Sequence, residues 1–433
     1  MLSPKEIKEL YKSLSTQKDW SFGESLPSET GKWTHSYHRY PAKFIPQLVE
    51  KLFDRYCDKK DMHINDPFMG SGTTVVSAIS RGFFASGTDI NGIAYLVTKV
   101  KSRPIDPIYL EAETDKLLSK IRVALNEESV EPLIPKINRE RIDYWFTTDK
   151  VIELGIINQI ISEYTDQTLR EYFTVAFSHI LKSCSIWLQS STKPTRDFSK
   201  KSSNTFFTLK KHLNKMKKGN LEFYKVVPKD TRENLDKYLN ISLSDARCQP
   251  VKDESVDLIV SSSPYVTSYE YADVHQLSTI WLNFAEDLKK YRGKFIGTAY
   301  KEMSKSRNFS KIAEEITYNM SSKDTRMAVE IGQFFFDMQE VFNESYRILK
   351  PGGRCCFVIG NTKLVGVEIL NAEVFTESLQ IAGMKIDDIV KREIPSKILP
   401  QNRDSKTGKF ASVSNADSQA YPVEYVVVGQ KDG

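Results

Sequence analysis

The sequence predicts an α/β fold built on a mostly parallel sheet of about seven strands, with a large helical insertion. The first observation is a strand, a glycine-rich turn, a helix and a second strand within residues 62–89, which is the order of a parallel βαβ unit. The second is that further strand-like runs appear only after residue 238. The third is the helical periodicity of the segment between them, residues 101–239.

The βαβ unit begins at the apolar run MHIND, residues 62–66. The glycine-containing sequence FMGSG follows, then TTVVSAISR with helical character, and then FFASGTDI, a β-type run that reaches Asp89. Ligands of open α/β sheets bind at the carboxyl ends of the strands. We therefore expect the glycine turn and Asp89 to lie at the same edge of the sheet.

Five later runs complete the predicted sheet. LNISL at 239–243, VDLIVSSS at 256–263 and RCCFVIG at 354–360 have the composition of buried strands. KIDDIVKREI at 385–394 and VEYVVVGQK at 423–431 are expected to pair antiparallel at the end of the chain. The two strands of the βαβ unit bring the expected number to about seven.

The charge of the chain is unevenly distributed. The formal net charge is only +5, but a basic block falls within a short part of the helical segment, opposed only by Asp197. Such a block can neutralise phosphates, or it can be a solvated helix face with a loop, and charge alone does not separate these alternatives. The basic residues are Lys193, Arg196, Lys200, Lys201, Lys210, Lys211, Lys215, Lys217 and Lys218.

Composition argues against several classes of protein. No apolar run approaches the roughly 20 residues that span a bilayer, and the first residues lack the apolar core of a secretory signal. The five cysteines are scattered and odd in number, with no CxxC pair, so the sequence predicts neither a metal site nor a disulfide framework. We expect a cytoplasmic protein without a membrane partner.

The turn DPFMGSGTT, which begins at Asp66, fits three kinds of ligand site. A phosphate-binding P-loop would need a lysine that is missing here, and a dinucleotide fold would need a third glycine where Val75 stands. The third alternative, an S-adenosylmethionine site, needs a glycine turn at Gly70 and Gly72 and a carboxylate such as Asp89 for the ribose hydroxyls. Asp66 would repel a pyrophosphate but suits an ammonium and a sulfonium, so the third alternative is favoured.

The sequence SSSPY, residues 261–265, lies at the end of the strand expected at 256–263 and contains Ser262, Ser263, Pro264 and Tyr265. It can be a plain strand-to-loop turn, because serine and proline are common in turns. It also suits methyl transfer to an aromatic amine, whose lone pair is delocalised until acceptors bind both amino hydrogens. The Ser262 hydroxyl and the Ser263 carbonyl can supply these acceptors, proline restrains the loop, and tyrosine offers a face on which a flipped-out base can stack.

Taken in order, these motifs resemble the amino-group DNA methyltransferases of restriction–modification systems, of the Ser-Pro-Pro-Tyr type. The resemblance covers most of the chain outside the helical segment and implies an S-adenosylmethionine-dependent methyltransferase fold. HRYPAKFIPQLVEKLF, residues 38–53, resembles the segment that holds the methionine end of the cofactor, which implies that role for Lys43 and Phe44. YRILKPGGR, residues 346–354, resembles a helix-to-strand turn common to the fold.

The same resemblance implies further cofactor contacts. DPFMGSGTT resembles the cofactor turn, and TDIN resembles the strand end that binds the ribose. SDAR resembles the position that contacts the adenine amino group. The implied cofactor-binding residues are Asp66, Phe68, Gly70, Gly72, Asp89, Asn91 and Asp245.

SSSPY resembles the catalytic Ser-Pro-Pro-Tyr motif, and its first residue bears on the target base. Family members with serine at this position usually act on cytosine N4, and those with aspartate or asparagine on adenine N6, so Ser262 implies cytosine. Ser263 departs from the family by replacing the first proline, which leaves a looser loop or an altered base choice open. Cytosine-C5 enzymes use a Pro-Cys nucleophile, and this dipeptide does not occur in the sequence.

The resemblance implies a catalytic domain formed by residues 30–100 and 240–433, with residues 101–239 as a basic insertion that recognises DNA. It implies double-stranded DNA as substrate and a cognate restriction endonuclease as a partner. Three alternatives stay open: an adenine-N6 DNA methyltransferase, an RNA-base methyltransferase, and an inactive relative that binds DNA.

Overall fold

The protein is described by a computed structural model. It describes residues 1–40, 44–127, 130–191, 193–266, 271–298, 310–394, 402–403, 418–419 and 423–433. Lys43 of the predicted cofactor site lies outside these residues. Within them, no helix is long and apolar enough to cross a membrane.

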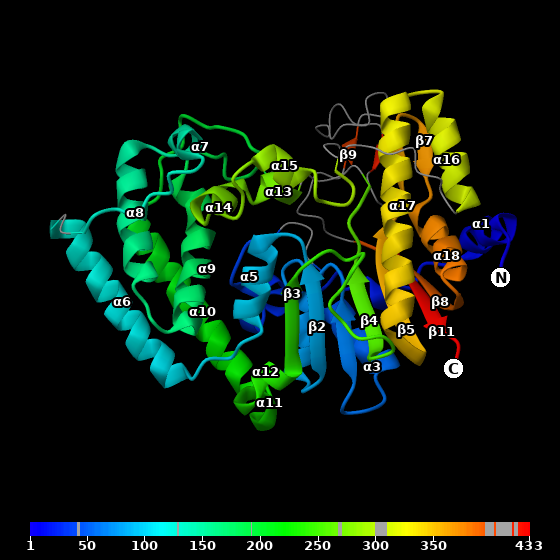
Figure 1. The fold of residues 1–433 in the computed structure, drawn as a ribbon, viewed down its shortest axis with the longest axis horizontal. Helices are drawn as coiled ribbons and strands as arrows, with labels where there is room; N and C mark the ends of the chain where they lie inside the picture. The colour runs from blue at the N-terminus through cyan, green and yellow to red at the C-terminus, as the bar shows by residue number, and fades with distance from the viewer. Residues whose placement is uncertain are drawn as a thin grey trace.

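A seven-stranded sheet forms the centre of the molecule, in the order β3-β2-β1-β4-β5-β11-β8 (Figure 1). Neighbours among β1 to β5 run parallel, whereas β11 runs antiparallel to both β5 and β8. This confirms the predicted mostly parallel sheet and its antiparallel end. The strands are β1 (His63–Asp66), β2 (Phe84–Asp89), β3 (Leu239–Leu243), β4 (Val256–Ser262), β5 (Leu349–Gly360), β8 (Met384–Glu393) and β11 (Val423–Lys431).

β5 is longer than the predicted strand 354–360, because it begins at Leu349, before the KPGG sequence. Its pairing with β4 shifts register between Val256 and Leu258. The glycines within KPGG accommodate this irregularity, since Gly352 adopts φ +78°. The sequence signal missed these residues because proline and glycine are ordinarily depleted in strands.

Helices cover both faces of the sheet, and the alternation of side chains along β5 shows this. Cys355 and Phe357 pack in a core with α17 (Thr325–Ile348) and α18 (Asn371–Ile381). Cys356 and Val358 pack in another with α3 (Pro46–Tyr56) and α4 (Thr73–Ser80). Successive strand residues point to opposite faces, so this unbroken apolar run is typical of a strand buried on both sides.

Between β2 and β3 the described chain is mainly helical, and most of it lies beyond the β3 edge of the sheet, whereas its first and last helices also contact β2 and β3 (Figure 1). A hydrophobic core joins the helices of residues 92–226, and it combines Trp145 and Phe177 of these helices with Trp281 of the later chain. Their division from the rest of the chain as a separate domain stays a prediction. The helices are α5 (Gly92–Lys101), α6 (Pro107–Glu127), α7 (Arg139–Trp145), α8 (Thr148–Ser162), α9 (Gln167–Cys184), α10 (Thr205–Val226), α11 (Lys229–Glu233) and α12 (Leu235–Tyr238).

Shorter elements complete the fold. They are α1 (Pro4–Ser13), η1 (Lys18–Trp20), α2 (Pro27–Thr30), η2 (Trp33–Ser36), α13 (Tyr271–Val274), α14 (Gln276–Trp281), α15 (Leu288–Arg292), α16 (Lys311–Ser321), β6 (Thr362–Leu364), β7 (Val367–Ile369), β9 (Asn402–Arg403) and β10 (Ser418–Gln419).

Candidate active site

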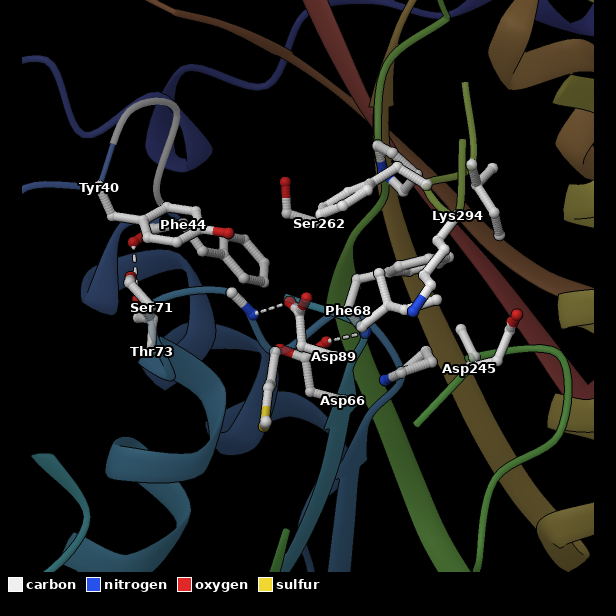
Figure 2. Close-up of a pocket in the computed structure, with 18 residues that line it drawn as sticks. Tyr40, Phe44, Asp66, Phe68, Ser71, Thr73, Asp89, Asp245, Ser262 and Lys294 are labelled. Carbon is white, nitrogen blue, oxygen red and sulfur yellow. Dashed lines mark hydrogen bonds between the residues drawn. The ribbon is translucent and has the colours of Figure 1, made fainter. Parts of the chain in front are cut away.

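A pocket opens at the carboxyl ends of β1, β2 and β4, where the strand order reverses direction around β1 (Figure 2). This is the position at which open α/β sheets bind ligands. Eight of the predicted site residues line it, from both the cofactor set and the catalytic loop: Phe44, Asp66, Phe68, Gly70, Asp89, Asp245, Ser262 and Pro264.

The turn between β1 and α4 requires its glycines. Gly70 and Gly72 have φ values of +47° and +76°, a region that L side chains rarely adopt. A Cβ on Gly72 would come within 2.7 Å of Thr98 Oγ1 on α5, and that same hydroxyl donates to the Gly70 carbonyl at 3.0 Å. Gly72 therefore faces α5 and does not line the pocket, so its contribution is to let the turn pack closely against this helix.

Asp89, at the end of β2, holds the turn and the start of α5 together. Its carboxylate accepts from the Gly70 N–H at 2.9 Å and from the Asn91 N–H at 2.8 Å. Desolvation raises the pKa of Asp89 to about 6, and these hydrogen bonds oppose the rise. Asn91 itself is buried away from the pocket, where its Oδ1 accepts from the Ile93 N–H at 3.0 Å and caps α5.

Asp66, at the end of β1, is buried beside Asp89. Its Oδ1 accepts from the Ser261 hydroxyl at 2.6 Å and from the Phe68 N–H at 3.0 Å. Burial raises the pKa of Asp66 to about 6, and the charge of Asp89 adds to the effect. Neither carboxyl forms an ion pair within the described part of the chain. A cationic ligand in the pocket would therefore supply the positive charge that these two carboxyls lack.

Asp245 forms another side of the pocket and is oriented by Arg247. The Arg247 Nε and Nη2 donate to the two carboxylate oxygens at 3.0 and 2.7 Å, in the bidentate geometry that fixes a carboxylate most firmly. The Arg247 Nη1 donates a hydrogen bond to Asp337 Oδ1 on α17 at 2.8 Å. The position of Asp245 is thus fixed from outside the pocket.

Ser262 is the last residue of β4, and Figure 2 shows its side chain above the two carboxyls of Asp66 and Asp89. Pro264 also lines the pocket, whereas Ser263 is buried, and its N–H donates to the Val358 carbonyl on β5 at 3.2 Å. The Ser263 hydroxyl is buried without a hydrogen-bond partner among the described residues. The loop therefore presents Ser262 to the pocket and anchors the next residue to the sheet.

Tyr265 does not line the pocket. Its ring is partly buried against the core that contains α17, and its hydroxyl donates to Glu424 Oε1 at 2.6 Å. Glu424 also accepts from Arg392 Nη1 at 2.9 Å. A hydrogen bond to β11 thus sets the orientation of the Tyr265 ring, whose face is expected to stack on a base. The local sequence does not predict this bond, because β11 lies far along the chain.

Several lining residues were not predicted. Tyr40 belongs to the distinctive HRYPAKF sequence, which is the signal that could have identified it. Lys294, Phe295 and Ile296 follow α15 and line the side of the pocket that also carries Asp245 (Figure 2). Their segment carries no recognisable motif, and only the tertiary fold brings it to the strand ends.

Comparison with known proteins finds similar sequences among bacterial and archaeal methyltransferases. The chain is 27% identical over 414 residues to the Type II methyltransferase M.MvaI of Kocuria varians, and the match covers 90% of both chains. It is 22% identical over 447 residues to M.BsoBI of Geobacillus stearothermophilus, covering 88% of this chain and 83% of that one. A shorter match to M.MjaII of Methanocaldococcus jannaschii is 41% identical over 101 residues, 23% of this chain and 19% of the relative.

No protein-family model matches the chain. Among solved structures, an S-adenosylmethionine-dependent methyltransferase from Methanosarcina mazei has a TM-score of 0.30 and 9% identity, covering 88% of this chain and 97% of that one. TrmN from Thermus thermophilus has a TM-score of 0.30 and 11% identity, covering 90% of this chain and 49% of that one. Both scores are low.

Proposed function

We propose that the chain is a DNA methyltransferase that transfers a methyl group from S-adenosylmethionine to an exocyclic amino group, as the modification enzyme of a restriction–modification system. The observation that carries this proposal is the placement of Ser262 above Asp66 and Asp89 in one pocket (Figure 2). The similarity to Type II methyltransferases along nearly the whole chain supports it.

The pocket fits S-adenosylmethionine. The cofactor carries an ammonium and a sulfonium, and Asp66 and Asp89 are acceptors without an ion-pair partner in the described part of the chain. Asp89 would accept from the ribose hydroxyls, Asp245 from the adenine amino group, and Phe68 and Ile296 offer apolar contacts to the adenine. When bound, the cofactor supplies a methyl group made electrophilic by the positively charged sulfur.

The chain's own residues then prepare the amine. The Ser262 hydroxyl and the Ser263 carbonyl accept hydrogen bonds from the amino group of the target base. These bonds localise the nitrogen lone pair, so that it points toward the methyl group. The Ser263 N–H, bound to the Val358 carbonyl, and Pro264 restrain the loop so that these acceptors keep their geometry. Holding the amine and the methyl donor in line supplies much of the rate.

Cytosine N4 is the proposed target, because a serine stands at the first catalytic position, where adenine-N6 enzymes usually have aspartate or asparagine. Residues 30–100 and 240–433 form the proposed catalytic domain, and the basic segment 101–239 contacts double-stranded DNA. A cognate restriction endonuclease is the expected partner in the cell.

The decisive experiment incubates the protein with isotopically labelled S-adenosylmethionine and mixed-sequence duplex DNA, with RNA in a parallel reaction. The proposal expects label in DNA as N4-methylcytosine. Label found only as N6-methyladenine would refute the choice of base, and label found only in RNA would refute DNA as the substrate. A protein that binds DNA but neither binds the cofactor nor transfers methyl would be an inactive relative.

Cofactor affinity should fall in mild acid. Because a cationic ligand favours the ionised carboxyls, protonation of Asp66 and Asp89 below their pKa of about 6 opposes binding. At pH 5 the affinity for the cationic analogue sinefungin should be lower by about tenfold for each carboxyl that must ionise. Calorimetric titration between pH 5 and 8 measures this dependence. Asp89→Asn should remove the part of the pH dependence that arises from Asp89.

The effect of these groups on folding has the opposite sign. Their folded-state pKa is raised, so the stability they contribute is present below about pH 4 and is lost as the pH rises through about 6. A weaker affinity at pH 5 is therefore not explained by the titration of Asp66 and Asp89 in the free protein. A flat affinity profile between pH 5 and 8 would contradict the assignment of the cationic cofactor to this pair.

Tyr265 should tolerate the loss of its hydroxyl better than the loss of its ring. Tyr265→Phe removes the hydrogen bond to Glu424 and keeps a surface for the base, so turnover should stay within about threefold. Tyr265→Ala should lower turnover by roughly tenfold, the scale of one stacked base. Measuring turnover together with the thermal midpoint tests this, and a purely structural Tyr265 would lower stability without a selective loss of turnover.

A further inference from the structure

Between α9 and α10, residues 186–191 and 193–197 form the two sides of a short hairpin, which backbone hydrogen bonds hold together. Leu188 N–H donates to the Thr195 carbonyl at 2.8 Å, and Asp197 N–H donates to the Ile186 carbonyl at 2.7 Å. Trp187 is buried and stacks on Trp145 of α7, with ring centroids 5.0 Å apart. This polar loop is therefore anchored in the helical core and presents a defined surface.

Positive charge gathers at the base of this hairpin, where Asp197 acts on Lys200 but does not form an ion pair with it. Lys182 donates to the Ser191 carbonyl at 2.7 Å, and Lys200 donates to the Lys182 and Trp187 carbonyls at 2.7 Å. No carboxylate lies within ion-pair distance of either ammonium in the described part of the chain. Burial, together with the charges of Arg39 and Lys200, lowers the pKa of Lys182 to about 8.

Some cations elsewhere in the helical part are paired with carboxylates. Lys99 lies 2.6 Å from Glu171, and Lys116 lies 2.6 Å from Glu113. Hydrogen bonds to carbonyls satisfy the donors of an ammonium but leave its net charge. The hairpin base thus keeps a local positive potential, which an anionic partner would compensate.

Arg196 occupies an unusual place on the hairpin. Its guanidinium lies 4.1 Å from the ring centroid of Tyr144 and 4.3 Å from that of Phe198, and Phe198 is 76% exposed. The two rings restrain the planar group, so less entropy is lost when it forms further hydrogen bonds. An exposed phenylalanine contributes little to folding, which points to a role in contact with a partner.

The hairpin lies on the same side of the molecule as the pocket. The Gln189 amide, with its oxygen toward Arg39, accepts from the Arg39 Nη2 at 3.0 Å. Arg39 precedes Tyr40, which lines the pocket. In Figure 1 the chain between α9 and α10 is at the end of the molecule where the strands β1 to β4 finish.

We propose that this hairpin reads duplex DNA beside the catalytic pocket, with Arg196 hydrogen-bonded to the edge of a guanine, and Arg39, Lys182 and Lys200 placed against the backbone phosphates. The inference rests on the proposed function and adds the residues that select the site. The guanidinium fork matches the O6 and N7 acceptors of guanine in the major groove, which a hairpin is narrow enough to enter. Phosphates match the positive charge of Lys182 and Lys200 at its base.

The test selects bound duplexes from a random-sequence library in the presence of sinefungin and measures affinity at several salt concentrations. Arg196→Lys keeps the charge but loses the fork, so it should lose preference for guanine at one position by about tenfold with little change in salt dependence. Lys182→Ala should weaken binding to all sequences alike and reduce the salt slope by roughly one. Lys116→Ala, with the same change in net charge, should alter neither.

The outcomes separate this inference from the proposed function. If the wild type methylates DNA but Arg196→Lys enriches the same sequence with the same preference, the hairpin does not read the base. If Lys182→Ala and Lys116→Ala have equal salt slopes, the hairpin base does not hold phosphates. If the wild type transfers no methyl to DNA, the proposed function fails, whereas the binding selection still decides whether the hairpin contacts DNA. Thermal midpoints of all variants confirm that each is folded.

Discussion

Replacing Ser262 with alanine should lower the rate of methyl transfer by about two to three orders of magnitude and leave the affinity for sinefungin nearly unchanged. The Ser262 hydroxyl stands at the end of β4 in the pocket, where it can accept an amino hydrogen of the target base. That interaction strengthens as the amine becomes nucleophilic, so its loss acts on turnover more than on binding. Single-turnover kinetics with labelled cofactor measures the effect.

A matched control is available in Ser77→Ala. Ser77 is a buried serine of α4 whose hydroxyl has no partner among the described residues, and it does not line the pocket. Its replacement should change neither turnover nor cofactor affinity. If Ser262→Ala retains turnover close to that of Ser77→Ala, the catalytic assignment of the loop is incorrect.

Asp89→Ala should weaken sinefungin binding by about a hundredfold, near the upper end of the loss expected for a charge-assisted hydrogen bond. The reason is that Asp89 is proposed to bind the ribose and also organises the turn through Gly70 and the start of α5 through Asn91. The measurement is calorimetric titration, supported by the rise in thermal midpoint that the analogue produces.

Two further variants define the cause of that loss. Asp89→Asn keeps an acceptor but removes the charge, so its affinity should lie between those of the wild type and Asp89→Ala. Asp236→Ala removes an exposed carboxylate that pairs with Arg103 away from the pocket and should bind as the wild type does. Unchanged affinity in Asp89→Ala would mean that the ribose lies elsewhere.

The sheet could be predicted because its strands leave a strong local signal. Runs such as VDLIVSS and VEYVVVGQK are apolar on both faces, and such a run indicates a strand covered by helices on both sides. The carboxyl ends of parallel strands then bring Asp66, Asp89 and Ser262 to one edge, so much of the pocket follows from topology alone.

The rest depends on contacts that no local pattern encodes. Gly72 and Asn91 belong to motifs that were correctly placed at the pocket, but neither lines it. Gly72 packs against α5, and Asn91 caps the start of that helix. Tyr265 turns toward β11 because Glu424 accepts its hydroxyl. Lys294 and its neighbours reach the pocket only through the folding of a segment without a motif. Side-chain direction at a loop is set by partners distant in sequence, which periodicity does not reveal.

The adjacent Cys355 and Cys356 of β5 point into the two separate layers that flank the sheet. Both thiols are fully buried, and burial raises the pKa of Cys355 to about 12 and that of Cys356 as well, so neither reacts while its layer is closed. Because neighbouring strand residues face opposite ways, each thiol is uncovered by a different opening event. The rate at which each thiol reacts therefore measures how often the hydrophobic core on its own face of the sheet opens, independently of the core on the other face.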